Sequence, residues 1–347
     1  MNNNILPLLP KIYFPGAVFL GPKSPDFLKS ISGFKKIVVT ASLFKESNKE
    51  VFDGLFGDSA ECFFQDREPH VEDLEKLKKR CADNGCDYLV AIGGGSVIDL
   101  AKMAKRELRK KMVAMPTTIG SGAEASQHVV LIENGAKKVF SSPEFLPEIV
   151  ILNPNYLKTL TEKQVVYQSI DALAHAFEAL VSRMSNTLSD SISLNSINII
   201  YRNLKKIAEG TKMDKVLEEI QIGSFLSGIA QSSVGTGLCH ALAHYFGAKN
   251  NISHSAAIAI FLLDVLNLNN GHSDKYKKLD QSKELTSQNF LEKLTKLFYD
   301  LKIEPEKVVL SEEPEKIAEI VRRDICTITN PYAPRASDIV EIIKHHK

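Results

Sequence analysis

The sequence changes its pattern near Pro154, and this change limits the folds that the chain can adopt. Before Pro154, short runs of apolar and β-branched residues alternate with amphipathic stretches of helical periodicity. Short continuous apolar runs are typical of strands that a parallel sheet buries on both faces. Such strands are expected at residues 37–40, 62–64, 88–92, 111–115 and 149–152. The alternation of strands with helices favours a doubly wound α/β domain.

After Pro154 the strand signals almost disappear and helical periodicity dominates. Helices are expected near residues 162–182, 187–208, 213–229, 234–247, 253–267, 286–301 and 312–323. The polar stretch 267–287 is expected to be a surface loop. The sequence therefore predicts two domains, an α/β domain over residues 1–154 and an all-helical domain over residues 155–347.

The composition of the 347 residues indicates a globular protein that acts on a small molecule. With 44% hydrophobic residues the chain can bury enough apolar surface to fold, and no apolar run reaches the ~20 residues of a membrane span. The 43 basic and 42 acidic residues nearly cancel, so there is no broad positive field for nucleic acid or a membrane surface. Five scattered cysteines form no disulfide framework, and the N-terminal stretch lacks a basic leader. A cytoplasmic protein without a signal peptide is therefore expected.

Three consecutive glycines and a serine, Gly93 to Ser96, follow the strand expected at residues 88–92 and open a helix. Glycine lets the backbone approach a ligand closely, and the free N–H groups at a helix start form an anion site. A diphosphate is the natural occupant, and a tight turn without a ligand is the alternative. A second turn rich in hydroxyls and glycine, residues 116–124, follows the next strand. Adjacent strand ends of an α/β sheet form its ligand crevice.

Two pairs of potential metal ligands occur at helical spacing in the second half. Asp171 and His175 are four residues apart, as are His240 and His244, and His254 follows them. Residues at i and i+4 share a helix face, so one divalent cation can contact both members of a pair. Ordinary core or surface histidines are the alternative. Three imidazoles and one carboxylate would leave a divalent ion with net positive charge, so that it can act as a Lewis acid on a substrate oxygen.

Together these motifs resemble the iron-containing (group III) alcohol dehydrogenases. The resemblance rests on residues 93–102, 116–124, 171–175 and 240–254, in matching order and separation, with Asn330-Pro331 near the C-terminus. It covers nearly the whole chain. It implies an N-terminal dinucleotide-binding domain with a parallel sheet, like that of dehydroquinate synthase, followed by a C-terminal helical domain. It also implies a homodimer.

The resemblance assigns roles to individual residues. The implied ligands of Fe²⁺ or Zn²⁺ are Asp171, His175, His240 and His254. His244 resembles the family's histidine near the nicotinamide and is the expected catalytic proton relay. The implied cofactor residues are Gly94, Gly95 and Ser96 at the diphosphate, Thr117, Thr118 and Ser126 along the cofactor, and Lys138 near its ribose or nicotinamide end.

The chain departs from the family pattern after its first predicted strand. Where the family often has an aspartate that holds the adenosine ribose hydroxyls, this chain has Ala41-Ser42. The loss of that carboxylate removes repulsion toward a 2′-phosphate, and Ser42 or Lys45 would contact one, so NADPH is expected over NADH. A commonly seen Asn-Pro is Glu68-Pro69 here, which places an unneutralised carboxylate near the expected cofactor groove.

The function implied by the resemblance is reversible hydride transfer between a nicotinamide cofactor and a small primary alcohol or its aldehyde. The short chain and the segments Lys137-Lys138 and Ser141-Ser142-Pro143 are similar to the phosphonoacetaldehyde reductase branch. That similarity implies reduction of phosphonoacetaldehyde to 2-hydroxyethylphosphonate. A dehydroquinate synthase-like lyase and a catalytically inactive nucleotide-binding module on the same fold are the alternatives.

Overall fold

The structure is a computed structural model that describes residues 11–57, 60–303 and 307–346. The chain divides into two compact units, one from Tyr13 to Thr161 and one that continues from Glu162. The first unit extends beyond the predicted boundary at residue 154, because the short helix η5 (Pro154–Leu157) belongs to it. The N-terminal stretch, for which no signal peptide is expected, falls within residues 1–10 and lies outside the described residues.

The first unit is built on a sheet whose described strands are all parallel, in the order β1-β8-β5-β4-β2-β3. The strands are β1 (Ala17–Leu20), β2 (Lys36–Thr40), β3 (Cys62–Phe64), β4 (Tyr88–Gly93), β5 (Lys111–Pro116) and β8 (Ile149–Leu152). The five strands predicted from sequence are confirmed. Strand β1 is an addition, and because all four of its residues are exposed, its sequence lacks the pattern of a buried strand.

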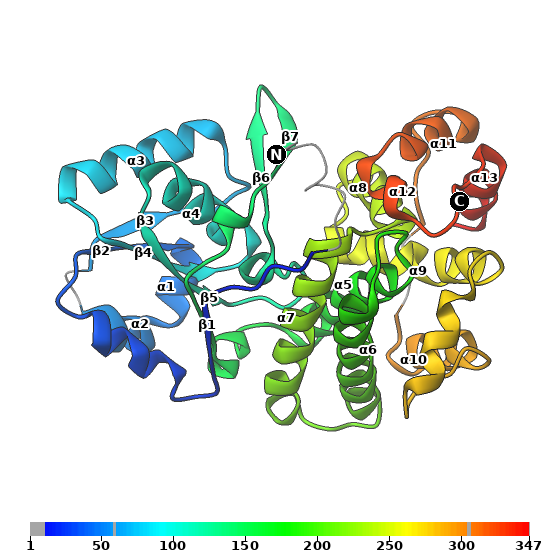
Figure 1. Ribbon diagram of the computed structural model, residues 1–347, viewed down its shortest axis with the longest axis horizontal. Helices are drawn as coiled ribbons and strands as arrows, with labels where there is room; N and C mark the ends of the chain where they lie inside the picture. Colours follow the sequence, from blue (N-terminus) through cyan, green and yellow to red (C-terminus); the bar gives the residue numbers. More distant parts are fainter. Residues whose placement is uncertain (1–10, 58–59, 304–306, 347) are drawn as a thin grey trace, which may run out of the picture. The chain divides into compact units, whose positions relative to one another are not determined.

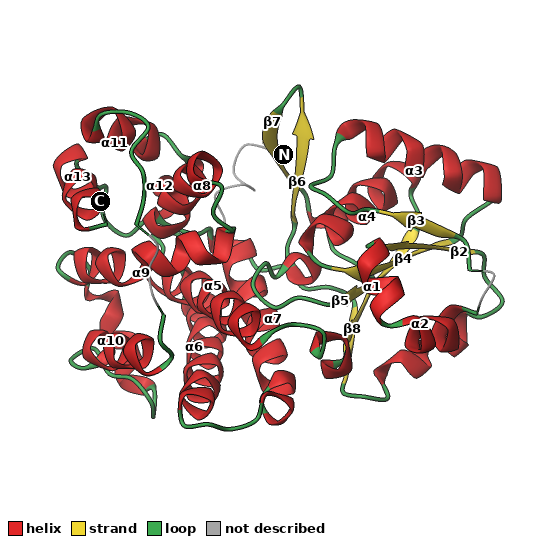
Figure 2. Ribbon diagram, turned by 180° about the vertical axis from the view of Figure 1, so that it is seen from behind, coloured by secondary structure: helices red, strands yellow, loops and turns green. Residues whose placement is uncertain are grey.

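Helices lie on both faces of this sheet, as Figures 1 and 2 show. They are η2 (Ser24–Ile31), α1 (Ser42–Ser47), α2 (Lys49–Phe56), α3 (Val71–Asn84) and α4 (Gly95–Leu108). Phe44 of α1 and Phe52 of α2 share one buried cluster with the strand residues Val38 and Val90. Burial of each such aromatic ring stabilises the unit by a few kcal/mol. The predicted doubly wound α/β fold is confirmed, and its packed core holds the ends of the strands in place.

An antiparallel hairpin that the sequence did not predict projects beyond the main sheet (Figure 1). It consists of β6 (His128–Glu133) and β7 (Ala136–Ser141). Strand β7 has no buried residue, and β6 buries only two positions, so neither strand shows the continuous apolar run of the parallel strands.

One buried and one partly buried side chain of α4, Lys102 and Asp99, tie this hairpin to the helix. The Lys102 ammonium donates to the carbonyl of Ala123 at 2.9 Å and to the carbonyl of His128. Asp99 accepts the N–H of Val130 at 2.9 Å and lies 3.3 Å from the Lys102 ammonium. Burial raises the pKa of Asp99 and lowers that of Lys102, because both charged forms lose water, although each charge favours the other.

The second unit is helical. Its described helices are α5 (Glu162–Val181), α6 (Thr187–Ala208), η6 (Met213–Lys215), α7 (Leu217–Val234), α8 (Leu238–Asn250), α9 (His254–Asn270), η7 (Asp274–Gln281), α10 (Phe290–Asp300), α11 (Pro314–Arg322), α12 (Ile325–Thr329) and α13 (Ala336–His345). The seven predicted helices are confirmed with small shifts of their ends. Helices α12 and α13 are additions, and η7 occupies part of the predicted loop 267–287. In the described part of the chain, the longer helices are too polar to cross a membrane.

Helix α5 packs against α6, α7 and α9 and is buried along nearly its whole length. Its buried residues include the polar side chains Ser169, Asp171, His175 and Glu178. A buried charge is costly unless it is paired or binds an ion. The buried charged side chains of helix α5 are therefore expected to be paired or to bind an ion.

Replacement of Lys102 by methionine tests the tie between α4 and the hairpin. The variant leaves the largely buried Asp99 without its cation and two carbonyls without their donor, so we expect a loss of about 3–5 kcal/mol in stability. Thermal unfolding followed by circular dichroism measures the effect. Lys76→Met on the exposed face of α3 is the matched control and should change stability by less than about 0.5 kcal/mol. A Lys102→Met protein as stable as this control would show that the tie contributes nothing.

Candidate functional site

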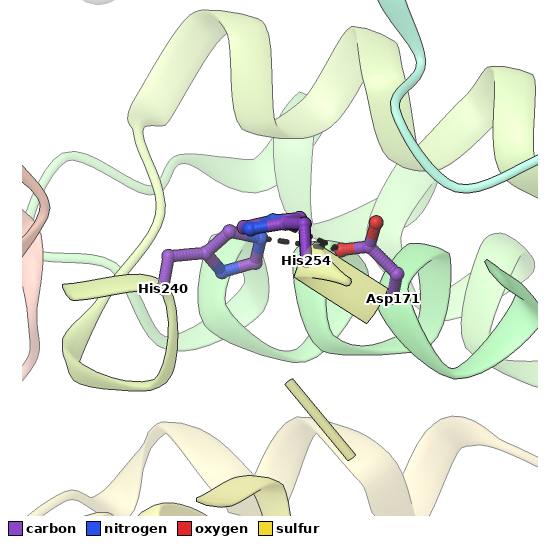
Figure 3. Close-up of side chains that lie close together, drawn as sticks. All are labelled: Asp171, His240 and His254. Atoms are coloured by element: carbon purple, nitrogen blue, oxygen red, sulfur yellow. Dashed lines mark ion pairs between the residues drawn. The ribbon is translucent and has the colours of Figure 1, made fainter. Parts of the chain in front are cut away.

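Four side chains from three helices meet inside the helical unit. Asp171 and His175 lie one turn apart on α5, His240 is in the first turn of α8, and His254 is the first residue of α9. The Asp171 Oδ1 atom is 3.7 Å from His175 Nδ1, 3.5 Å from His240 Nε2 and 3.7 Å from His254 Nε2. Figure 3 shows the rings of His240 and His254 beside the Asp171 carboxylate. The structure therefore brings the four predicted ligands together.

The cluster has the spacing of ligands around an ion. In a tetrahedral site with bonds of ~2.0–2.1 Å, neighbouring ligand atoms are ~3.3–3.4 Å apart, close to the distances from Asp171 Oδ1. Within the described residues, Asp171 Oδ1 and His240 Nε2 are buried and have no hydrogen-bond partner. Buried polar atoms without partners are rare in proteins and call for an ion or an unseen group. The donor set fits a divalent transition metal.

The pKa shifts of Asp171 and His240 agree with a site that binds a cation. Burial alone would raise the pKa of Asp171, but the imidazoles of His254, His175 and His240 outweigh it and lower the pKa overall. Burial alone would lower the pKa of His240, but the carboxylates of Glu178 and Asp171 outweigh it and raise the pKa to about 9. The site therefore keeps Asp171 ionised and favours positive charge beside it.

Glu178 is a part of this site that sequence reasoning missed. Its carboxylate is buried and accepts the ring Nδ1–H of His240 at 2.6 Å and the N–H groups of Gly237 and Cys239 at 2.7 Å each. The hydrogen bond to Nδ1 leaves Nε2 of His240 facing Asp171. A carboxylate behind a metal-binding imidazole fixes its tautomer and orientation. The available signal was spacing, because Glu178 follows His175 by three residues on the same helix face.

His244 lies next to the cluster but has a different partner. Its Nδ1 atom is 3.0 Å from Asp324 Oδ2, and its ring stacks on that of His254 with centroids 5.7 Å apart. Asp171, His240 and His254 offer ligand atoms that all lie within 4.8 Å of one another, and neither His244 nor His175 belongs to this closest group. Asp324 was not predicted, since it lies 80 residues away in the sequence.

The glycine turn in the α/β unit has the geometry of a phosphate cradle. Strand β4 ends at Gly93, and α4 begins at Gly95 with Gly94 as its cap. A methyl group on Gly94 would approach Thr118 to 3.2 Å, and one on Gly95 would approach Ser121 to 3.2 Å. The two predicted turns are therefore neighbours, and larger side chains would crowd the space between them. The first N–H groups of a helix lack intrahelical partners and can bind an anion.

A groove of about 680 Å³ runs from this turn along the ends of β2 and β3. Its lining includes Gly94, Gly95 and Ser96, together with Ala41, Ser42, Leu43, Glu46, Gln65, Asp66, Arg67, Glu68 and Val97. This volume and the glycine turn fit a dinucleotide. The other predicted cofactor residues do not line the groove: Thr117 and Ser126 are buried, Thr118 faces Gly94, and Lys138 pairs with Glu133 on the hairpin.

Comparison with known proteins shows the family to which the chain belongs. Residues 15–154 match the family described as iron-containing alcohol dehydrogenase, and residues 165–346 match the C-terminal part of the Fe-containing alcohol dehydrogenase family. The chain belongs to the iron-containing alcohol dehydrogenase family. The iron-containing alcohol dehydrogenase of Thermococcus thioreducens superposes with a TM-score of 0.84 at 25% identity, over 97% of this chain and 99% of that chain.

Curated relatives match shorter stretches. The probable alcohol dehydrogenase EutG of Escherichia coli is 32% identical over 58% of this chain, and 4-hydroxybutyrate dehydrogenase of Clostridium kluyveri is 30% identical over 60%. The matched stretches span 56% and 63% of those two proteins. Lactaldehyde reductase of E. coli is 28% identical over 75% of this chain and 77% of its own length.

Two sequence expectations for this family member need correction. Glu68 is not an unneutralised carboxylate, because the Lys137 ammonium pairs with it. The expectation that the cofactor is NADPH and not NADH also loses its support. The Lys45 ammonium lies 5.0 Å from the Phe52 ring centroid and 3.6 Å from Cys62 Sγ and does not line the groove, while Ser42 is hydrogen-bonded to a carboxylate.

A Glu178→Gln variant tests the role of this buried carboxylate. The amide would still occupy the space but would remove the charge behind His240, so we expect metal affinity to fall about 10-fold to 100-fold. Competition between the protein and a chelator for Zn²⁺ or Fe²⁺ measures this affinity. Glu162→Gln at the exposed start of α5 is the control. Wild-type affinity in Glu178→Gln would contradict the positioning role.

Glu124, buried in the second turn, should make stability depend on pH. Burial raises its pKa to about 7, although its backbone hydrogen bond and the Lys102 charge partly oppose this. Between about pH 4.5 and 7 the unfolded chain releases this proton while the folded chain keeps it, so stability falls as pH rises, by about 3 kcal/mol in all. Glu124→Gln should therefore melt above wild type at pH 8 and close to it at pH 5. An equal difference at both values would refute the shift.

Proposed function

We propose that this protein is a metal-dependent NAD(P)H oxidoreductase that interconverts a small primary alcohol and its aldehyde. The observation that carries the proposal is the convergence of three imidazole nitrogens on one buried carboxylate oxygen, in a chain that also carries the glycine turn. Membership of the iron-containing alcohol dehydrogenase family supports it.

The helical unit would hold the metal. Asp171, His175, His240 and His254 are the proposed ligands, with Fe²⁺ as the resident ion by family and Zn²⁺ suited to the same donors. A metal held by these residues would supply a Lewis acid for a carbonyl oxygen, and a nicotinamide cofactor would supply or accept the hydride. Glu178 keeps His240 oriented throughout.

The α/β unit would hold the dinucleotide. The N–H groups at the start of α4 bind its diphosphate, and Gly94 and Gly95 allow the close approach that this requires. We assign Thr117 and Thr118 to the second turn that supports this cradle, Ser126 to the segment directly after that turn, and Lys138 to the neighbouring hairpin.

His244 would exchange the proton of the alcohol. Burial alone would raise the pKa of Asp324, but the hydrogen bond and charge of His244, together with hydrogen bonds from Cys326, outweigh it and lower the pKa overall. Asp324 therefore stays ionised and holds the proton on Nδ1 of His244, which leaves Nε2 to accept or donate a proton. His244 is 47% exposed in its side chain, so it can pass the proton on to water.

Phosphonoacetaldehyde is our candidate for the physiological aldehyde, and its reduction would give 2-hydroxyethylphosphonate. The support is the similarity of the segment from Lys137 to Pro143 to that branch of the family. Assays with phosphonoacetaldehyde, lactaldehyde and propanal, each with NADH and NADPH, test the assignment. Equal kcat/KM for the three aldehydes would reject it. We also propose a cytoplasmic homodimer, which sedimentation equilibrium tests.

His254→Gln tests the metal centre. We expect bound metal to fall well below one ion per chain and turnover of aldehyde with NAD(P)H to fall at least about a hundredfold, because a Lewis acid contributes several kcal/mol to the barrier. Elemental analysis and a coupled absorbance assay give the two readouts. His272→Gln, at another exposed histidine of the same unit, is the control. Full metal content and turnover in His254→Gln would reject the ligand set.

Dinucleotide binding without turnover in the wild type would favour the inactive-module alternative.

A further inference from the structure

The chain lacks a carboxylate after β2 but has one on the neighbouring strand. Strands β2 and β3 are adjacent and parallel, with Thr40 paired to Phe64. Ser42 and Asp66 each follow their strand by two residues, so they meet at the carboxyl edge of the sheet. The Ser42 N–H donates to Asp66 Oδ1 at 2.6 Å, and the Ser42 hydroxyl donates to Asp66 Oδ2 at 2.7 Å.

Asp66 lies on the same edge as the glycine turn. Strand β4, which ends at Gly93, pairs with β2 on the side opposite β3. Asp66, Ser42 and Gly94 consequently line one groove. Asp66 is exposed, so a ligand in this groove can reach its carboxylate. Each of its oxygens accepts one hydrogen bond from Ser42 and retains a second lone pair.

The Asp66 carboxylate disfavours a second phosphate beside it. The lining carboxylate of Glu68 is paired with Lys137. The lining cation Arg67 is 3.2 Å from the Asp73 carboxylate, and Lys45, as described above, is directed at Phe52 and Cys62. A 2′-phosphate would therefore meet the Asp66 carboxylate, whereas the hydroxyls of an unmodified ribose can donate to it.

We propose that Asp66 selects NAD(H) over NADP(H) by accepting hydrogen bonds from the adenosine ribose hydroxyls, with Ser42 as the residue that positions it. This inference rests on the proposed function for the identity of the ligand. Asp66 replaces, from β3, the carboxylate that the sequence after β2 lacks.

The test compares binding of ADP-ribose and 2′-phospho-ADP-ribose by calorimetry, because neither ligand requires turnover. Wild type should bind ADP-ribose at least ~10-fold more tightly, the effect of one charge-assisted hydrogen bond. Asp66→Asn should weaken ADP-ribose binding and strengthen binding of the 2′-phospho ligand, which reduces the ratio to near one. The circular dichroism spectrum and melting temperature of the variant confirm that it is folded.

Glu46→Gln is the matched control, since it removes the same charge from the same groove. It should leave the ratio of the two affinities within ~2-fold of wild type, because screening weakens exposed charges that make no contact. Three outcomes would each overturn the assignment to Asp66. They are equal affinity of the wild type for the two ligands, an affinity ratio in Asp66→Asn that equals the wild-type ratio, and a change of this ratio in Glu46→Gln as large as that in Asp66→Asn. Selective ADP-ribose binding without turnover of any aldehyde would support Asp66 and overturn only the proposed function. Failure to bind either ligand would overturn both.

Discussion

The carboxylate of Glu178 joins two parts of the helical unit that are distant in sequence, helix α5 and the start of α8. It is buried on α5 and accepts hydrogen bonds from the start of α8 and from the ring of His240. These bonds satisfy N–H groups that a helix start leaves without partners, and they place negative charge where the helix dipole favours it. The same carboxylate therefore fixes the position of α8 and the direction of one proposed metal ligand. Without it, His240 would lose the partner that keeps its Nε2 atom facing Asp171.

In the α/β unit, backbone geometry rather than a buried carboxylate brings the candidate cofactor-binding groups together. Parallel strands bring the ends of β2, β3, β4 and β5 to one edge, and the glycine turn opens that edge to an anion. Lys102 and Asp99 then secure the hairpin to the helix that follows the turn. The central strands of this unit are apolar and buried, and the two polar turns follow the ends of β4 and β5.

Local patterns were enough to predict most of the fold, and the resemblance to the iron-containing alcohol dehydrogenases supplied the proposed ligand set. Asp171 and His175, one helical turn apart, are visible in sequence because their spacing alone puts them on one face. Glu178 and Asp324 were missed because their partners lie about 60 and 80 residues away, and no periodicity connects them. Asp66 was missed because its importance depends on which strand lies beside β2. The strands outside the prediction, β1 and the hairpin, are mostly exposed and so lack a buried strand's pattern.

Gly237, the cap of α8, has a negative φ that other residues could adopt. A methyl group there would lie 2.7 Å from Glu178 Oε1 and 2.9 Å from Asn330 Oδ1, two acceptors that bind the backbone around it. The requirement for glycine is thus one of space between two buried polar groups, and not of backbone freedom. Even alanine at this position would have to push apart the groups that hold His240, so substitutions here are expected to act on metal binding although Gly237 has no side chain to offer an ion.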